Sequence, residues 1–149
     1  LYKGKFTFYN SYRKGLSKLF NQLKREYDLV ILTGDNEGEI ENLKKLLPTK
    51  TKLIFNQKPN DKLEYIKYHQ AEGAKVLMIG DGLNDAGALA QSNVGIALSE
   101  NVNVFSPACD AILDASKFNQ LYNFIDASKS AIKIIKWSFA LSFIYNIIG

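Results

Sequence analysis

The sequence contains one cysteine and one histidine among 149 residues, so it is poor in the side chains that cross-link chains or hold zinc. The single cysteine, Cys109, excludes an internal disulfide framework and suits a reducing compartment. A zinc site needs several such ligands, so we expect Cys109 and His69 to be packing or surface residues. No secretory signal begins the chain and Leu1 is not an initiator methionine, so we expect a piece of a longer protein.

The charged residues include no arginine-rich run. Lysine and arginine outnumber aspartate and glutamate by 19 to 15, for a formal net charge of +4, and the lysines are spread along the chain. This distribution is typical of a solvated surface and disfavours nucleic-acid binding. Hydrophobic residues make up 46% of the chain, which favours one folded domain with a buried core over a disordered segment.

Short apolar runs alternate with amphipathic segments, which indicates an α/β fold. Strands that are nearly all apolar favour a mostly parallel sheet covered by helices on both faces. We expect Asn60 or Asp61 to cap the third helix. The predicted strands cover 4–9, 29–32, 52–55, 76–79, 94–98 and 111–113, and the predicted helices contain the apolar positions of 16–23, 40–47 and 63–66, with a short helix over 86–91.

The tail of the chain changes character. Residues 118–129 are amphipathic, whereas 137–149 are almost all apolar. As a helix, the apolar stretch would span only about 20 Å at ~1.5 Å per residue, and a bilayer core is about 30 Å thick. Two interpretations stay open: an apolar helix packed on the domain, or a transmembrane helix cut off partway. In the second, Lys129, Lys133 and Lys136 would mark the cytoplasmic end.

A glycine-bracketed turn follows the strand predicted over 76–79. It reads Gly-Asp-Gly-Leu-Asn-Asp and places two carboxylates, Asp81 and Asp85, at the carboxyl end of that strand. Open α/β sheets bind ligands at this edge. Carboxylates together with close backbone approach suit a hard divalent cation and a phosphate.

Two further segments supply partners for these carboxylates. Thr33 begins a Thr-Gly-Asp-Asn sequence at the end of the strand predicted over 29–32, and Lys62 lies near the start of the third helix. A hydroxyl, an ammonium and two carboxylates at one sheet edge suit phosphoryl transfer, in which Lys62 and Mg²⁺ neutralise charge on the phosphoryl oxygens.

Taken together, these elements resemble the phosphorylation domain of P-type cation ATPases, within the haloacid dehalogenase superfamily. Residues 33–36 match the family's Thr-Gly-Asp-Asn, residues 80–85 match its Gly-Asp-Gly-x-Asn-Asp, and Lys62 matches the lysine between them. The resemblance covers nearly the whole chain. It implies a Rossmann-like three-layer sandwich in a cation-translocating ATP hydrolase that uses Mg²⁺ and ATP.

The resemblance also implies roles for the matched residues. Asp81 would ligate Mg²⁺, and Asp85 would support the metal site and its hydrogen bonds. Thr33 and Lys62 join these two as implied catalytic residues. The residues implied to bind phosphate or nucleotide are Gly34, Asp35, Asn36, Gly82 and Asn84.

The end of the tail resembles one subfamily. Tyr145 and Asn146 are similar to the Tyr-Asn pair of the membrane helix that follows this domain in heavy-metal, copper-type ATPases, where the pair contributes to the transported-metal site. A polar asparagine in an apolar span is a functional candidate on physical grounds too. The alternative is that Tyr145 is an interfacial aromatic and Asn146 a helix-end residue. The resemblance implies Cu⁺ transport by a membrane protein whose residues 1–128 form a cytoplasmic domain and whose residues 129–149 begin a membrane helix.

The sequence departs from the family in two places. Gly87 stands where the family usually has proline, so we expect a looser start to the short helix and unchanged chemistry. The Asp-Lys-Thr-Gly-Thr motif, whose aspartate is the family's nucleophile, is not in the chain. The chain therefore resembles the part downstream of that motif, with Asn10-Ser11-Tyr12-Arg13 in the place of the usual Asp-x-x-Arg.

Without a nucleophile, the isolated chain is expected to be inactive. One alternative is a soluble phosphatase of the same superfamily, which needs an Asp-x-Asp that the strand predicted over 4–9 does not carry. Another is a regulatory module that binds Mg²⁺ and phosphate without catalysis. If the tail belongs to a membrane span, its apolar surface should make the isolated chain associate into dimers or larger species.

Overall fold

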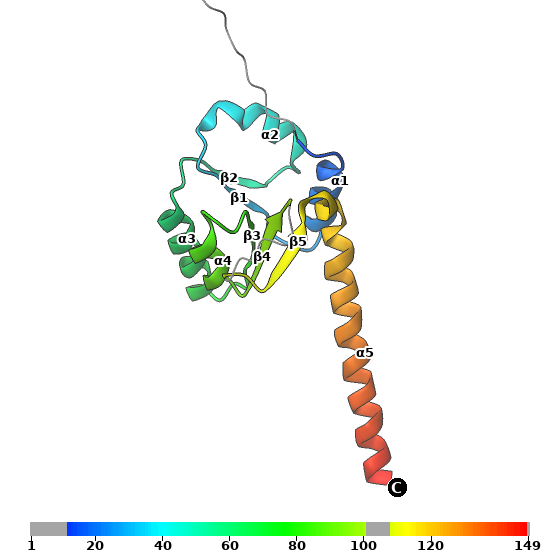
Figure 1. The fold of residues 1–149 in the computed structure, drawn as a ribbon. Helices are drawn as coiled ribbons and strands as arrows, with labels where there is room; N and C mark the ends of the chain where they lie inside the picture. Colours follow the sequence, from blue (N-terminus) through cyan, green and yellow to red (C-terminus); the bar gives the residue numbers. More distant parts are fainter. Residues whose placement is uncertain (1–11, 101–107, 149) are drawn as a thin grey trace, which may run out of the picture.

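A computed structural model describes residues 12–100 and 108–148 (Figure 1). The strand predicted over 4–9, and the positions Asn10 and Ser11, lie outside the described residues. The helices are α1 (Leu16–Leu23), α2 (Ile40–Leu46), α3 (Pro59–Ala71), α4 (Ala86–Gln91) and α5 (Leu121–Ile148), and the strands are β1 (Val30–Leu32), β2 (Lys52–Ile54), β3 (Leu77–Gly80), β4 (Val94–Ser99) and β5 (Ala111–Asp114). The predictions of strand and helix in the described ranges are confirmed, with ends shifted by a residue or two.

The described strands form two parallel sheets. β1 pairs with β2, and β3, β4 and β5 pair in that order. The α/β class with parallel pairing is therefore confirmed, but the strands lie in two separate sheets. Among the described strands, β1 and β3 each have a paired neighbour on one side only.

The three-stranded sheet is closely covered by α4. A Cβ on Gly95 of β4 would lie 2.5 Å from the carbonyl oxygen of Leu89, so only glycine lets the α4 backbone approach the strand this closely. Leu89 and Ala88 of α4 and Ala97 of β4 are buried. The helix that follows the Gly-Asp-Gly-Leu-Asn-Asp turn is thus held firmly on its sheet.

A second cluster joins α1 to the start of α5. Leu19 and Leu23 project from one face of α1, as their helical spacing predicts, and pack with Leu121. Leu29, just before β1, and Ile96 of β4 pack against this cluster as partly buried residues. The cluster therefore fixes the first turn of α5 against both parts of the fold.

The start of α3 differs from the prediction. The helix begins at Pro59, with Lys58 at the capping position, so the prediction that Asn60 or Asp61 caps the helix is wrong. Proline pre-sets the dihedral angle of the first helical residue, which starts the helix earlier. Asp61 lies in the first turn, where its Oδ2 accepts a hydrogen bond of 2.9 Å from the Lys58 backbone N–H.

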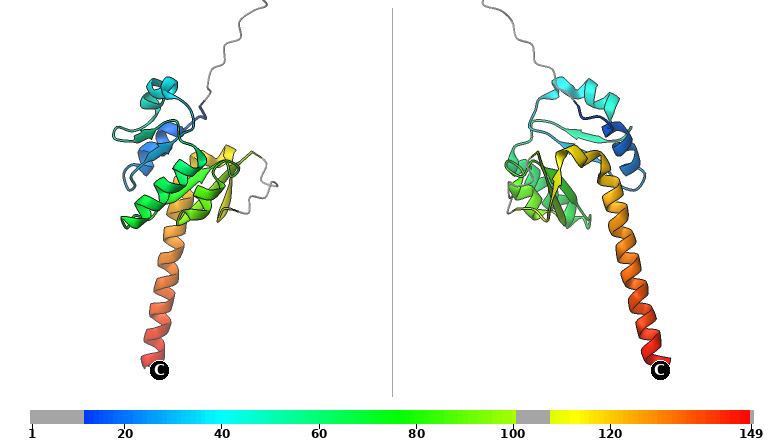
Figure 2. Two further views of the ribbon diagram at one scale, coloured as in Figure 1. Left: turned by 90° about the vertical axis from the view of Figure 1, so that its left-hand side faces the viewer. Right: turned by 45° about the vertical axis from the view of Figure 1, so that its right-hand side comes forward.

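The long helix α5 leaves the domain (Figures 1 and 2). Every residue from Asp126 to Ile148 is exposed. The interpretation of an apolar tail packed on the domain is therefore wrong. The helical stretch Ala115–Ile148 is the one helix in the described part of the chain that is long and apolar enough to cross a membrane, judged by length and composition. The boundary between residues 128 and 129 falls inside α5.

Candidate functional site

The turn after β3 fixes Asp81 through the backbone. Its Oδ1 accepts hydrogen bonds from the N–H groups of Leu83 at 3.1 Å and Asn84 at 3.2 Å. Gly82 makes the turn possible because its φ of 82° lies in the left-handed region. The Oδ2 atom accepts only a long contact of 3.4 Å from the Asn84 side chain. Asp81 is exposed and keeps one carboxylate oxygen available for a ligand.

Asp85 and Lys62 form a buried ion pair beside this turn. Lys62 Nζ lies 2.7 Å from Asp85 Oδ1, and the two side chains are only 13% and 11% exposed. The lysine comes from the second turn of α3, and the aspartate immediately precedes α4. The pairing was not part of the sequence prediction, although both residues were expected at one edge.

Gly80, the last residue of β3, makes room for the pair. A Cβ at this position would lie 2.5 Å from Asp85 Oδ2 and 2.8 Å from Asp85 Cβ. Real Cβ atoms do not approach other atoms so closely, so a larger residue would displace Asp85. The first glycine of the turn therefore packs against the carboxylate that Lys62 holds.

On the other sheet, Thr33 and Asp35 bind each other. Thr33 Oγ1 donates to Asp35 Oδ2 at 3.1 Å and accepts from the Asp35 N–H at 3.1 Å. The backbone of this loop is tied to the segment after β2, since Asn56 N–H donates to the Asp35 carbonyl and Gln57 N–H to the Thr33 carbonyl, both at 2.9 Å. The loop is therefore held open at the carboxyl end of β1.

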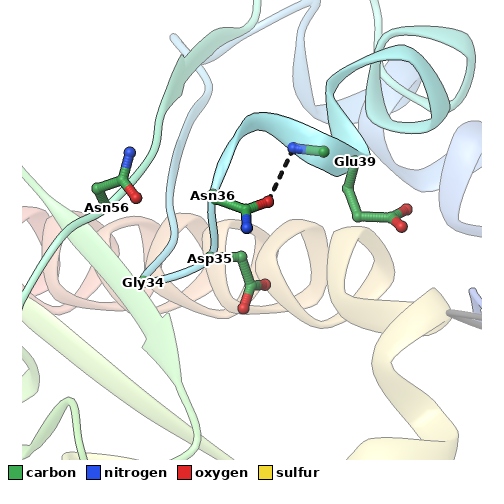
Figure 3. Close-up of a pocket in the computed structure, with 6 residues that line it drawn as sticks. Gly34, Asp35, Asn36, Glu39 and Asn56 are labelled. Carbon is green, nitrogen blue, oxygen red and sulfur yellow. Dashed lines mark hydrogen bonds between the residues drawn. The ribbon is translucent and has the colours of Figure 1, made fainter. Parts of the chain in front are cut away.

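A polar hollow of about 580 Å³ opens beside this loop (Figure 3). Asn36 Oδ1 accepts a hydrogen bond from Gly38 N–H at 3.0 Å, and this bond shapes one wall. Sequence reasoning named Gly34, Asp35 and Asn36 here but missed Asn56, whose left-handed φ of 56° gives no motif signal. The residues that line the hollow are Gly34, Asp35, Asn36, Gly38, Glu39 and Asn56.

The structure brings together only some of the predicted site residues. No hydrogen bond or ion pair within residues 12–100 and 108–148 joins Thr33 or Asp35 to the Lys62–Asp85 pair. Tyr145 and Asn146 lie in the last turn of α5, where Tyr145 is 75% exposed. The predicted site residues thus fall into three sets. The β1 group follows β1 and consists of Thr33, Gly34, Asp35 and Asn36. The β3 group lies at the end of β3 and consists of Lys62, Asp81, Gly82, Asn84 and Asp85, and Tyr145 with Asn146 forms a separate pair at the far end of α5.

The β3 group fits magnesium. The described residues contain no group of three His, Cys, Asp or Glu that could cage a metal. Mg²⁺ does not need such a cage, because it is usually held by one or two carboxylates together with substrate phosphates and water. Asp81 supplies a carboxylate with an available oxygen, whereas Asp85 already pairs with Lys62 at 2.7 Å. The donor set therefore suits one Mg²⁺ at Asp81, with Asp85 positioning the lysine.

Comparisons with known proteins agree with this chemistry. Residues 2–93 match the family model of haloacid dehalogenase-like hydrolases. The chain is 35% identical over 146 residues to a copper-transporting ATPase of Helicobacter pylori, covering 96% of this chain and 19% of that protein. It is 34% identical over 122 residues to copper-transporting ATPase 1 of Mus musculus, covering 82% of this chain and 8% of that protein.

A solved structure is similar as well. The crystal structure of a zinc-transporting PIB-type ATPase superposes with a TM-score of 0.74 at 25% identity, covering 85% of this chain and 21% of that chain. The chain thus spans less than a fifth of the two copper-transporting relatives, 8% of one and 19% of the other.

Proposed function

Since the chain belongs to the haloacid dehalogenase-like hydrolases and is homologous over most of its length to copper-transporting P-type ATPases, we propose that it is the C-terminal part of the phosphorylation domain of a heavy-metal transport ATPase, with Cu⁺ as the transported ion. The whole enzyme would transfer a phosphoryl group from ATP to an aspartate and then hydrolyse the acyl phosphate while it moves the cation. This chain would supply the half of the site that binds Mg²⁺ and phosphate.

The observation that supports this proposal best is the buried Lys62–Asp85 pair next to the exposed Asp81 carboxylate. A buried ion pair costs desolvation energy and is weak evidence for stability alone. It holds the Lys62 ammonium in one place at the carboxyl end of β3, where a phosphoryl group would meet it. Fixed charges of this kind stabilise the charge that develops during phosphoryl transfer.

In this proposal each site residue has its own role in phosphoryl transfer. Bound Mg²⁺ would neutralise charge on the transferred phosphoryl oxygens. Asp81 would hold it through the carboxylate oxygen that the backbone leaves available, and Asp85 would keep Lys62 aimed at the same oxygens. Thr33 and the N–H groups of its loop would orient the phosphoryl group from the β1 side. The hollow beside Asn36 would border the nucleotide.

The two sheets suggest where the missing nucleophile belongs. β1 and β3 each pair on one side only among the described strands, and each leads directly into a site loop. A parallel strand placed between them would satisfy both open edges and would end between the Thr33 loop and the Asp81 turn. In our proposal this strand comes from outside the chain and carries the nucleophilic aspartate, as the resemblance implies.

The isolated chain gives the simplest test. We expect no ATPase and no acyl phosphatase activity above background, because the sequence contains no Asp-Lys-Thr-Gly-Thr motif to supply the nucleophile. Turnover that depends on Mg²⁺ and that Asp81→Ala abolishes would contradict the proposal and favour a complete phosphatase. Reading the gene upstream of Leu1 is the companion test: an Asp-Lys-Thr-Gly-Thr motif there supports the ATPase, and an open reading frame that starts near Leu1 supports a binding module.

The membrane part of the proposal rests on α5. It is almost all apolar beyond Lys136, and side chains such as Trp137 and Leu141 are 69% and 70% exposed. In the proposal this half of α5 enters the bilayer, residues 1–128 stay on the cytoplasmic side, and Tyr145 with Asn146 reaches the transported ion. In solution the isolated chain should associate through this surface, and light scattering that shows a monomer at high concentration would contradict this expectation.

A further inference from the structure

In the segment between α1 and β1, the Glu26 carboxylate accepts two hydrogen bonds from α5. Its Oε1 accepts a hydrogen bond of 2.6 Å from Tyr122 Oη, and its Oε2 accepts one of 2.5 Å from Lys129 Nζ. Tyr122 and Lys129 are two helical turns apart and so lie on the same face of α5. The Lys129 ammonium also lies 4.9 Å from the centre of the Tyr27 ring. We name these four residues, Glu26, Tyr27, Tyr122 and Lys129, the Glu26 clamp.

The clamp lies where α5 leaves the domain. Before it, Leu121 is buried against α1. After Lys129, α5 makes no further hydrogen bond or ion pair with the rest of the described chain, and its side chains are exposed. Figure 2 shows the helix continuing away from the domain beyond this point. The direction of the outer part of α5 therefore depends on its first two turns and on what holds them.

The same segment leads directly to the phosphate-binding loop. Leu29 packs against the α1 cluster and its carbonyl accepts a hydrogen bond of 3.1 Å from Lys52 N–H, so β1 begins immediately after the clamp. The three residues of β1 then end at Leu32, and Thr33 follows directly. β1 pairs with β2 along its three residues, so this strand is the short covalent path that joins Thr33 to the segment of Glu26.

The charges of the clamp residues favour their hydrogen bonds at neutral pH. The hydrogen bonds from Lys129 and Tyr122 hold the pKa of Glu26 below its ordinary value, and the hydrogen bond to Glu26 raises the pKa of Lys129. Glu26 and, to a smaller extent, Asp126 on the same helix raise the pKa of the Tyr122 phenol. Glu26 is thus ionised, and Tyr122 and Lys129 are protonated, across the physiological range.

We propose that Glu26 is the positioning residue that couples the phosphoryl-transfer edge to the membrane helix: it fixes the direction of α5 and passes movement of β1 to it. The coupling role rests on the proposed function, whereas the orienting role does not. An exposed ion pair contributes little to global stability because water and salt screen it. The α1 cluster holds only the first turn of α5, around Leu121. Two hydrogen bonds from one carboxylate to positions two turns apart hold the next part of the helix, and they are the last hydrogen bonds that α5 makes with the rest of the described chain.

The first test measures orientation on the chain itself, in detergent micelles. Spin labels are placed at Lys67→Cys on α3 and Ser138→Cys on α5, in a Cys109→Ser background. Glu26→Gln should broaden the distance distribution between the labels, and Tyr122→Phe should broaden it less. Asp28→Asn is the matched control, because Asp28 lies two residues away and pairs with Lys24 instead of α5. All variants should unfold within about 4 °C of the parent.

The result that overturns the orienting role is an unchanged distribution in Glu26→Gln, or equal broadening in Asp28→Asn.

The second test uses the transport ATPase that contains this chain. Glu26→Gln should leave the phosphoenzyme level unchanged and lower copper moved per ATP hydrolysed by about 5-fold or more. An unchanged ratio overturns the coupling role. A parent protein that forms no phosphoenzyme overturns the proposed function and with it the coupling, while the orienting role depends on the spectroscopic test alone.

Discussion

The two sheets, which carry the two sides of one site in our proposal, hold their residues in different ways. On the β3 side, Asp85 is buried, pairs with Lys62, and lies against Gly80 and a closely packed α4. On the β1 side, Thr33 is half-buried, Asp35 is exposed, and their side chains hydrogen-bond to each other. The β3 side is therefore built to hold charge in place, whereas the β1 side is an open loop beside a polar hollow.

This difference indicates that one side of the proposed site is rigid before a ligand binds, whereas the other side can adapt to the ligand. Separating the two charges of the buried pair is costly, because each would be left buried without a partner. The pair therefore keeps its geometry without a ligand. The β1 loop is held through its backbone but contains no buried charge, so its side chains can adapt when a phosphoryl group or a new strand reaches it. The predictions below test whether the two sides differ in this way, beginning with the largest expected effect.

Asp85→Ala should destabilise the domain by about 3 kcal/mol, since it leaves the Lys62 ammonium buried without a partner. Urea denaturation followed by circular dichroism measures the loss. Asp28→Ala is the control: it breaks an exposed pair with Lys24 and should cost less than about 0.5 kcal/mol. Similar losses for the two variants would show that the Lys62–Asp85 pair is not held more firmly than a surface pair.

Gly80→Ala should cost about 2 kcal/mol, because the new Cβ would overlap Asp85. The displaced carboxylate should also release Lys62, so the side-chain resonances of Lys62 should shift. An alanine variant with parental stability and an unshifted Lys62 would contradict the close packing described for this turn.

Gly87→Ala should raise the free energy of unfolding by roughly 0.5–1 kcal/mol, since alanine favours the helix and loses less backbone entropy on folding. The added Cβ would lie 3.9 Å from Leu63 Cδ2, an ordinary contact. The same denaturation assay measures the gain. A loss of stability here would mean that α4 tolerates no side chain at its second position.

A loss no larger than this gain is expected on the β1 side. Thr33→Ala removes two hydrogen bonds with Asp35 in a solvated loop and should cost only about 0.5–1 kcal/mol. Thr33→Ser is the control and should keep parental stability. If Thr33→Ala destabilised the domain as much as Asp85→Ala, the contrast between the two sides would not hold.

The positions of Thr33 and Asp81 at the ends of their strands could be predicted from the sequence, but the connections between side chains could not. Apolar runs that end in polar turns mark the strands and place Thr33 and Asp81 at their carboxyl ends. The pairing of Lys62 with Asp85 spans 23 residues and leaves no periodic signal. The contact of Glu26 with Lys129 spans 103 residues and depends on how α1 packs on α5. Local patterns specify local structure, whereas such long-range contacts depend on the packing of the whole fold.

The capping error at α3 has a local cause. Asn60 and Asp61 are good capping residues, but Pro59 starts the helix one residue before them and turns Asp61 into a first-turn acceptor. The separation of the sheets was not predictable for a different reason. Apolar runs identify strands one at a time and carry no information on which edge stays unpaired.

The most direct test of the central claim supplies the missing strand. The chain is mixed with a polypeptide that carries a strand ending in Asp-Lys-Thr-Gly-Thr and a nucleotide-binding domain, and acid-stable, hydroxylamine-sensitive acyl phosphate is measured after addition of radiolabelled ATP and Mg²⁺. We predict that acyl phosphate forms only in the mixture and falls roughly 100-fold or more when the chain carries Asp81→Ala or Lys62→Ala. No acyl phosphate in the mixture, or an amount that these substitutions do not change, would contradict the claim that this chain is the Mg²⁺ and phosphate half of a divided phosphoryl-transfer site.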